Sequence, residues 1–299
     1  MGATNEGEFE EASANCKEES YRIILDSCGE LPEELKSDDR FRQVALLIRI
    51  GEDTVVDDAS FDQADFLKKV AAYPTSPQSA CPSPDSYIEA IRGEVDNVFI
   101  ITLSERLSGS YSCADLASKL YREECDDNEK NIHVFNSKSA SCGETQIAFK
   151  IIECIEEGMN FKQVVHAVDQ YIESMNTYFV LETLEHLRKN GRLTGVRALV
   201  ASTLNIKPVM GSTPEGEIQQ LATARGVNKA LQKMIDIIEK DFPDSVNRRL
   251  AIAHCNCKER AIWVKEELLK RMKFMDIMIL DTAGISTLYA GDGGIIVTI

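Results

Sequence analysis

Short apolar runs alternate with segments of helical periodicity through the first half of the chain. Apolar runs of strand length occupy residues 22–27, 98–103 and 132–135. Apolar side chains recur at helical spacing over residues 61–72, 84–92, 111–124, 145–157 and 161–175. Strands that alternate with helices in this way are typical of α/β proteins with a mainly parallel sheet. Residues 44–50 and 53–57 flank Gly51 and predict a hairpin.

A proline-rich stretch, residues 73–84, interrupts this alternation. Its four prolines fix φ and remove backbone donors, so we predict no regular structure there. Ser83 followed by Pro84 is a typical helix start, a capping residue and then a first-turn proline.

The second half predicts further strands and helices in a less regular order. Strands are predicted at residues 177–181, 205–210, 217–223, 250–254 and 275–280. Helices are predicted at residues 184–191, where Gly191 ends a short helix, and at 196–204, 224–239 and 257–272. The third of these would open with Arg225 and Gly226. A glycine-rich segment then leads into a final apolar strand, within residues 283–299.

These patterns divide the chain into a tail and two α/β domains. Residues 1–20 are acidic, with six Glu and one Lys, and predict a disordered tail. We place an N-terminal α/β domain at residues 21–175, with a mainly parallel Rossmann-like sheet. A C-terminal α/β domain with a mixed sheet would cover residues 176–299.

Composition narrows the class of protein. A formal net charge of −16 over 299 residues disfavours nucleic acid and anionic membrane surfaces as partners. No apolar run is long enough for a transmembrane segment. The nine scattered cysteines and the lack of a signal-peptide pattern favour a cytoplasmic location with free thiols.

Hydroxyl-rich loops follow several of the predicted strands. In an open α/β sheet ligands bind beyond the carboxyl ends of the strands, where a helix N-terminus can receive an anion. Ser108, Gly109 and Ser110 stand at such a place, although a serine there can also simply cap its helix. Asp26 and Ser27 end the first strand, where a local turn is the alternative.

Two further groups of polar residues are candidates for binding. Thr75 and Ser76 lie in the stiff proline-rich stretch, which would position their hydroxyls or serve only as a linker. Arg188, Lys189 and Arg192 form a basic cluster in an acidic chain. The cluster either compensates a helix C-terminus or meets an anion or an acidic partner.

The common catalytic signatures are missing from the sequence. There is no dinucleotide fingerprint, no P-loop and no nucleophile elbow. Cys255 and Cys257 follow His254, but without a second ligand pair they are a weak metal signal, and we predict no metal site and no cofactor. Hydroxyl loops without an evident base indicate binding and no catalysis.

Taken together, these features resemble the DegV family of bacterial fatty-acid-binding proteins from about Tyr21 to Ile299. The resemblance rests on the order of several short motifs: Asp26-Ser27, Thr75-Ser76, Leu107-Ser-Gly-Ser-Tyr111, Asn136-Ser-Lys-Ser-Ala140, Leu184 to Gly195, Arg225-Gly226 and the glycine-rich C-terminal loop.

The resemblance implies two α/β domains that enclose one long-chain fatty acid, palmitate- or oleate-like. It places the carboxylate at Thr75, Ser76 and Ser108, with Gly109 and Ser110 beside it. Ser27 and Arg192 join the predicted ligand site.

The resemblance also implies a role as the acyl carrier of a fatty acid kinase, with Arg225 and Lys229 facing the kinase subunit. One departure is that Tyr289 stands where the family usually has a histidine, and Asp292 replaces a proline. A tyrosine hydroxyl can donate a hydrogen bond to a carboxylate but supplies no imidazolium.

Two other functions stay open at this point. A hydrolase or transferase could use Ser108 as its nucleophile, provided that a base lies within reach. A non-catalytic interaction module could instead act through Arg188, Arg192, Arg225 and Lys229.

Overall fold

A computed structural model describes residues 19–125, 130–193 and 205–299 of the chain. Its first sheet has four parallel strands in the order β2-β1-β6-β7. Their bounds are β1 Tyr21–Asp26, β2 Phe41–Val44, β6 Asn97–Thr102 and β7 Asn131–Asn136. The predicted parallel sheet is therefore confirmed.

Helices cover both faces of this first sheet, which explains why its central strands β1 and β6 are buried along nearly their whole length. Alternate residues such as Ile23 and Phe99 pack with α5 (Cys142–Glu156) and α6 (Phe161–Ser174). Their neighbours Ile24 and Ile100 pack with helices on the opposite face. These helices are α3 (Pro84–Ile91) and α4 (Ser110–Cys125).

The second sheet is mixed, as predicted, with the order β10-β9-β8-β13-β11-β12. Only β11 and β12 pair in parallel within it. The strands are β8 Thr177–Val180, β9 Ile206–Ser212, β10 Ile218–Arg225, β11 Arg249–His254, β12 Asp276–Asp281 and β13 Ile295–Thr298. Helices α8 (Val227–Asp241) and α9 (Lys258–Leu269) pack on one face.

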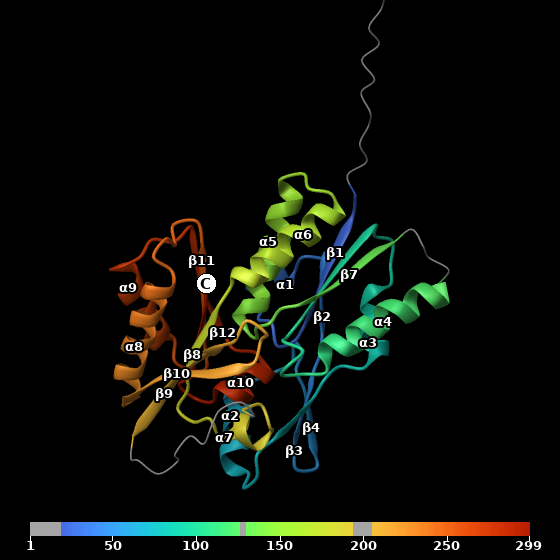
Figure 1. Cartoon of the computed structure of the whole chain (residues 1–299). Helices are drawn as coiled ribbons and strands as arrows, with labels where there is room; N and C mark the ends of the chain where they lie inside the picture. Colours follow the sequence, from blue (N-terminus) through green and yellow to red (C-terminus); the bar gives the residue numbers. More distant parts are fainter. Residues whose placement is uncertain (1–18, 126–129, 194–204) are drawn as a thin grey trace, which may run out of the picture.

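Helix α5 stands between the two large sheets, and Figure 1 shows it beside the first sheet on the side of β11 and β8. From α5, Gln146 donates its side-chain N–H to the carbonyl oxygen of Thr298 in β13 at 2.8 Å. Cys142 packs against Ala251 and Ala253 of β11. Helix α5 is therefore one of the elements that join the two halves of the fold.

A third, small antiparallel sheet has the order β4-β3-β5, with β3 Leu47–Ile50, β4 Asp53–Val56 and β5 Gln78–Ala80. The predicted hairpin is confirmed by the pairing of β3 with β4. The prediction that residues 73–84 hold no regular structure is wrong. The residues between Pro77 and Pro82 all have a backbone N–H, and β5 pairs with β3 within this segment.

Four short helices complete the described elements: α1 Glu33–Lys36, α2 Gln63–Ala72, α7 Glu185–Lys189 and α10 Gly284–Ala290. Helix α10 was not predicted. It packs on α2, α7 and β3, and Figure 1 shows it between the second sheet and α2.

Two helices predicted in the second half of the chain are not seen as predicted. Arg225 does not open a helix, because it is paired with Ile206 at the end of β10. The chain turns at Gly226, whose φ is +85°, and α8 begins at Val227. The helix predicted at residues 196–204 lies outside the described residues.

The predicted domain limits remain predictions, and the predicted tail lies almost wholly outside the described residues. Within the part of the chain that is described, no helix is both long and apolar enough to cross a membrane.

Candidate functional site

A pocket of about 840 Å³, counting its open side, lies between the two large sheets. Its apolar walls come from both halves of the chain, with Leu103 and Leu107 on one side and Phe179 and Ile296 on the other. Leu46, directly before β3, and apolar residues of α10 close it further. The aliphatic and phenylalanine side chains that line the pocket are Leu46, Leu103, Leu107, Ala140, Phe179, Leu181, Leu187, Ile218, Ile285, Ala290 and Ile296.

Two hydroxyl groups meet at the pocket wall. Ser79 of β5 and Tyr289 of α10 are hydrogen-bonded at 2.6 Å, and both side chains line the pocket. Burial raises the pKa of the Tyr289 phenol, which keeps it protonated at neutral pH. In a pair of hydroxyls one O–H is used between the partners, and the other remains to donate to a ligand.

Arg192 lies next to this hydroxyl pair. Its guanidinium carbon is 5.8 Å from the centre of the Tyr289 ring. Its Nε donates to the carbonyl oxygen of Leu107 at 3.1 Å, which draws the loop before Ser108 towards it. Among the residues that the structure describes, no carboxylate forms an ion pair with Arg192. The other lining cation, Lys138, is paired with Glu173.

Ser108 also lines the pocket, as predicted from its place after β6. Its hydroxyl is 3.1 Å from the Ser110 hydroxyl and accepts the Ser110 N–H at 3.2 Å. Within the described part of the chain, no histidine or carboxylate bonds to it. This gives no support to Ser108 as an activated nucleophile.

Ser79, Tyr289, Ser108 and Arg192 therefore form a polar group in the wall of a mostly apolar pocket, whose other polar lining residues are Lys138, Ser139, Ser141, Thr177, Ser212, Glu217 and Ser286. We call these four residues the head-group cluster. Its O–H and N–H donors, together with the Arg192 guanidinium, are suited to an anionic group such as a carboxylate.

Other predicted site residues lie elsewhere. Thr75 is exposed and does not line the pocket. The Ser76 hydroxyl bonds to Nδ1 of His186 at 2.8 Å, so it docks the proline-rich stretch onto α7. Whether these two residues contact a ligand stays a prediction, which their positions do not favour.

Three further predicted residues support the pocket from behind. The Ser27 hydroxyl donates to Asp57 at 2.9 Å and accepts the N–H of Leu46. Ser110 is buried below the loop, and Gly109 packs against Cys81. None of the three is among the lining residues.

The predicted partner residues and the C-terminal departure also have clear positions. Arg225 and Lys229 are exposed at the junction of β10 and α8. Asp292 accepts a hydrogen bond from the side chain of Asn256 at 3.0 Å and does not line the pocket. Asp292 is therefore not placed to repel an anion in the pocket.

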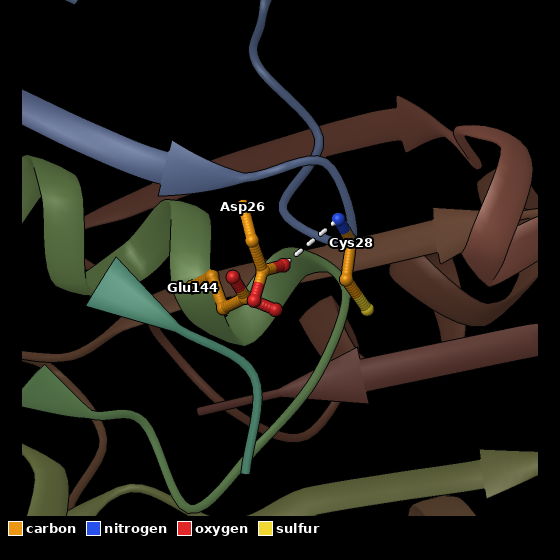
Figure 2. A group of neighbouring side chains, drawn as sticks. All are labelled: Asp26, Cys28 and Glu144. Atoms are coloured by element: carbon orange, nitrogen blue, oxygen red, sulfur yellow. Dashed lines mark hydrogen bonds between the residues drawn. The ribbon is translucent and has the colours of Figure 1, made fainter. Parts of the chain in front are cut away.

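A cluster of buried acids lies under the pocket floor, at the carboxyl end of β1. Figure 2 shows the carboxyl groups of Asp26 and Glu144 pointing towards each other, with Cys28 beside them. One ligand-type atom from each residue lies within 4.8 Å of the others. Asp26 accepts the backbone N–H groups of Cys28 at 3.0 Å and Leu103 at 2.9 Å.

Burial governs the ionisation of these acids. It raises the pKa of Asp26 to about 6 and that of Glu30 to about 7, and it raises that of Glu144 well above its usual range. Neither oxygen of Glu144 has a hydrogen-bond donor in the described structure. A proton on Glu144, donated to Asp26, satisfies both groups without a cation.

Sequence comparisons agree with this architecture. A model of the DegV family of uncharacterised proteins matches residues 20–299. A DegV domain-containing protein of Streptococcus pneumoniae R6 is 34% identical over 256 residues, which cover 86% of this chain and 89% of that protein.

Two solved structures are similar over nearly the whole chain. A DegV-family protein of Ruminococcus gnavus, refined with vaccenic acid, is 50% identical with a TM-score of 0.91, covering 95% of this chain and 100% of that one. The fatty acid kinase B3 protein of S. pneumoniae, loaded with linoleic acid, is 32% identical with a TM-score of 0.82. That match covers 93% of this chain and 98% of the other.

Proposed function

Because the chain belongs to the DegV family, we propose that it binds one long-chain fatty acid in the pocket between its two large sheets. The observation that carries the proposal is the head-group cluster in the wall of a mostly apolar cavity. The vaccenic acid in the structure that is 50% identical supports the same class of ligand.

The apolar walls supply the affinity in this proposal. A saturated chain with about 14 buried CH₂ groups gains up to about 11 kcal/mol at about 0.8 kcal/mol each, before the costs of association. This gain does not depend on the head group. The cluster therefore has to orient the carboxylate, and palmitate- or oleate-like chains are suitable ligands.

The carboxylate is placed by the head-group cluster. The free O–H of the Ser79–Tyr289 pair and the Ser108 hydroxyl donate to it, and Arg192 supplies the charge. This revises the predicted contacts, because Ser79 takes the place given to Thr75 and Ser76. It also gives Tyr289 a role as a neutral donor where the family usually has a histidine.

Matched substitutions test this placement. Ser108→Ala removes a hydrogen bond to a charged group, worth about 1.5–3 kcal/mol, so fatty-acid affinity should fall at least about tenfold. Ser79→Ala leaves the Tyr289 hydroxyl as a donor and should weaken binding a few-fold. Thr75→Ala is the control, since its side chain is exposed. Affinity can be measured by titration with a fluorescent fatty acid after the protein has been stripped of lipid.

Two results would contradict the proposal. If the purified protein releases no acyl chain on denaturation and takes up neither palmitate nor oleate, the ligand class is wrong. If Thr75→Ala weakens binding and Ser79→Ala does not, the head group lies at the proline-rich stretch, as the sequence alone predicted.

We further propose that the chain has no catalytic turnover and presents its fatty acid to a fatty acid kinase subunit. The similarity to the S. pneumoniae fatty acid kinase B3 protein supports this role. Arg225 and Lys229 are exposed and remain the proposed contact.

Charge reversal tests the partner contact. Arg225→Glu should reduce acyl-phosphate formation by a purified fatty acid kinase subunit and leave fatty-acid affinity unchanged. Lys240→Glu makes the same charge change at the far end of α8 and serves as control. Equal losses in both variants would assign the effect to net charge and not to this contact.

A further inference from the structure

Two cysteine side chains meet behind the head-group cluster. The Sγ atoms of Cys81 and Cys113 are 3.7 Å apart, and both residues are half-buried. Cys81 directly follows β5, and Cys113 lies in the first turn of α4. No other pair of thiols in the described residues has a comparable contact.

The pair connects two segments that carry pocket residues. Ser79 lies two positions before Cys81, and Ser108 lies five positions before Cys113. Between them is Gly109, where a Cβ atom would stand 3.0 Å from the Cys81 sulfur. The Gly109 carbonyl accepts the N–H of Cys113 at 3.0 Å, which fixes Cys113 in the first turn of α4.

We propose that Cys81 and Cys113 are a modification site, at which a peroxide converts the two thiols into a reversible disulfide. A disulfide has an S–S bond of about 2.05 Å, so the sulfurs need to approach by less than 2 Å. Rotation about the side-chain bonds supplies such a movement, because the two sulfurs already face each other.

The chemistry balances with one peroxide molecule per disulfide. The Cys81 thiolate attacks a peroxide oxygen, the O–O bond breaks and hydroxide leaves, which gives a sulfenic acid on Cys81. The Cys113 sulfur then attacks the Cys81 sulfur, the S–S bond forms, and the oxygen leaves as water. We assign the first attack to Cys81, since burial and the Cys81 neighbour raise the pKa of the Cys113 thiol.

A disulfide here would tie β5 to the start of α4, and thus Ser79 to Ser108. If the pocket holds a fatty acid, which rests on the proposed function, the disulfide should slow the exchange of this ligand with fatty acid in solution. The reduced protein would then exchange its ligand faster than the oxidised protein.

The test uses the full chain with Cys16 and Cys125 replaced by serine, which leaves the proposed pair and five other cysteines. After treatment with hydrogen peroxide, alkylation and proteolysis, mass spectrometry should find the Cys81 and Cys113 peptides joined. Dithiothreitol should separate them. In Cys113→Ser no joined peptide should form, and Cys257→Ser, which removes another half-buried thiol, should leave the joined peptide intact.

Free, fully alkylated Cys81 and Cys113 after oxidation would overturn the proposal, as would sulfinic acid without a joined peptide. Acyl exchange is measured separately, as release of a labelled fatty acid before and after oxidation. A joined peptide in a protein that never binds fatty acid would refute the proposed function and leave the modification site standing. Bound fatty acid without a joined peptide would do the reverse.

Discussion

Replacement of Glu144 by glutamine should stabilise the protein at neutral pH. Glu144 is fully buried beside Asp26, and its pKa is raised well above the usual range, chiefly by burial. In the folded chain it therefore carries a proton that the unfolded chain releases. Glutamine has nearly the same shape, never ionises, and can donate an amide N–H to Asp26 in place of the carboxyl O–H.

The magnitude follows from proton linkage. An unfolded glutamate ionises near pH 4.3, so below that pH both states hold the proton and Glu144 costs nothing. Above it, the unfolded state gains about 1.4 kcal/mol per pH unit from releasing the proton, until the pH reaches the raised pKa of the folded state. Each pH unit between the two pKa values therefore costs the folded protein about 1.4 kcal/mol, which is a sizeable fraction of typical domain stability.

The assay is urea unfolding followed by circular dichroism at several pH values between about 4.5 and 7.5. Wild type and Glu144→Gln should be equally stable at the acid end. Their difference should widen by about 1.4 kcal/mol per pH unit as pH rises. Lipid should be removed first, since a ligand that binds only the folded state adds its own stabilisation.

Glu156→Gln is the matched control, because it makes the same chemical change at an exposed position of the same helix, α5. Its curve should run parallel to that of the wild type. A Glu144→Gln curve that also ran parallel would show that Glu144 is ionised in the folded protein. In that case Glu144 would not donate a hydrogen bond to Asp26, and a bound cation would have to balance the charge of the two carboxylates.

Three further predictions concern the pocket. Tyr289→Phe should leave Ser79 as a donor and weaken fatty-acid binding only a few-fold, as seen by fluorescence titration, whereas a loss as large as that of Ser108→Ala would make the phenol the main contact. Phe179→Asp should abolish acyl retention by placing a charge in the apolar wall. An unchanged amount of lipid released on denaturation would show that the acyl chain of the ligand does not contact this wall. Gly216→Ala should lower the melting temperature, because φ is +85° and a Cβ would lie 2.8 Å from the Lys138 Cα, so an unchanged value would show that this turn yields easily.

The sequence predicted the large elements because their residues repeat with one period. The strand at Val98 to Leu103 is apolar at every position except Thr102, and a strand buried on both faces needs no other signal. The Ser108 loop was found for a related reason, since it follows such a strand directly. Both predictions depend only on residues that are close together in the chain.

The head-group cluster could not be assembled in the same way. Ser79 is separated from Tyr289 by 210 positions, and each lies in an element that the sequence did not reveal. β5 is only three residues long and sits among prolines, and α10 begins at Gly284, a poor helix former. The one local signal for Ser79 was the gap between Pro77 and Pro82, where the backbone keeps its donors.

Helix α10 is anchored at both ends to a sheet from the other half of the chain. The N–H groups of Gly284 and Ile285 donate to the Asp57 carboxylate at 2.7 and 2.9 Å, and Tyr289 near the other end bonds to Ser79. In amide hydrogen exchange, the first turn of α10 should therefore open together with the small β4-β3-β5 sheet and not with β12 and β13, its neighbours along the chain. The cooperative unit around the head-group cluster would then combine segments that lie more than 200 residues apart in the sequence.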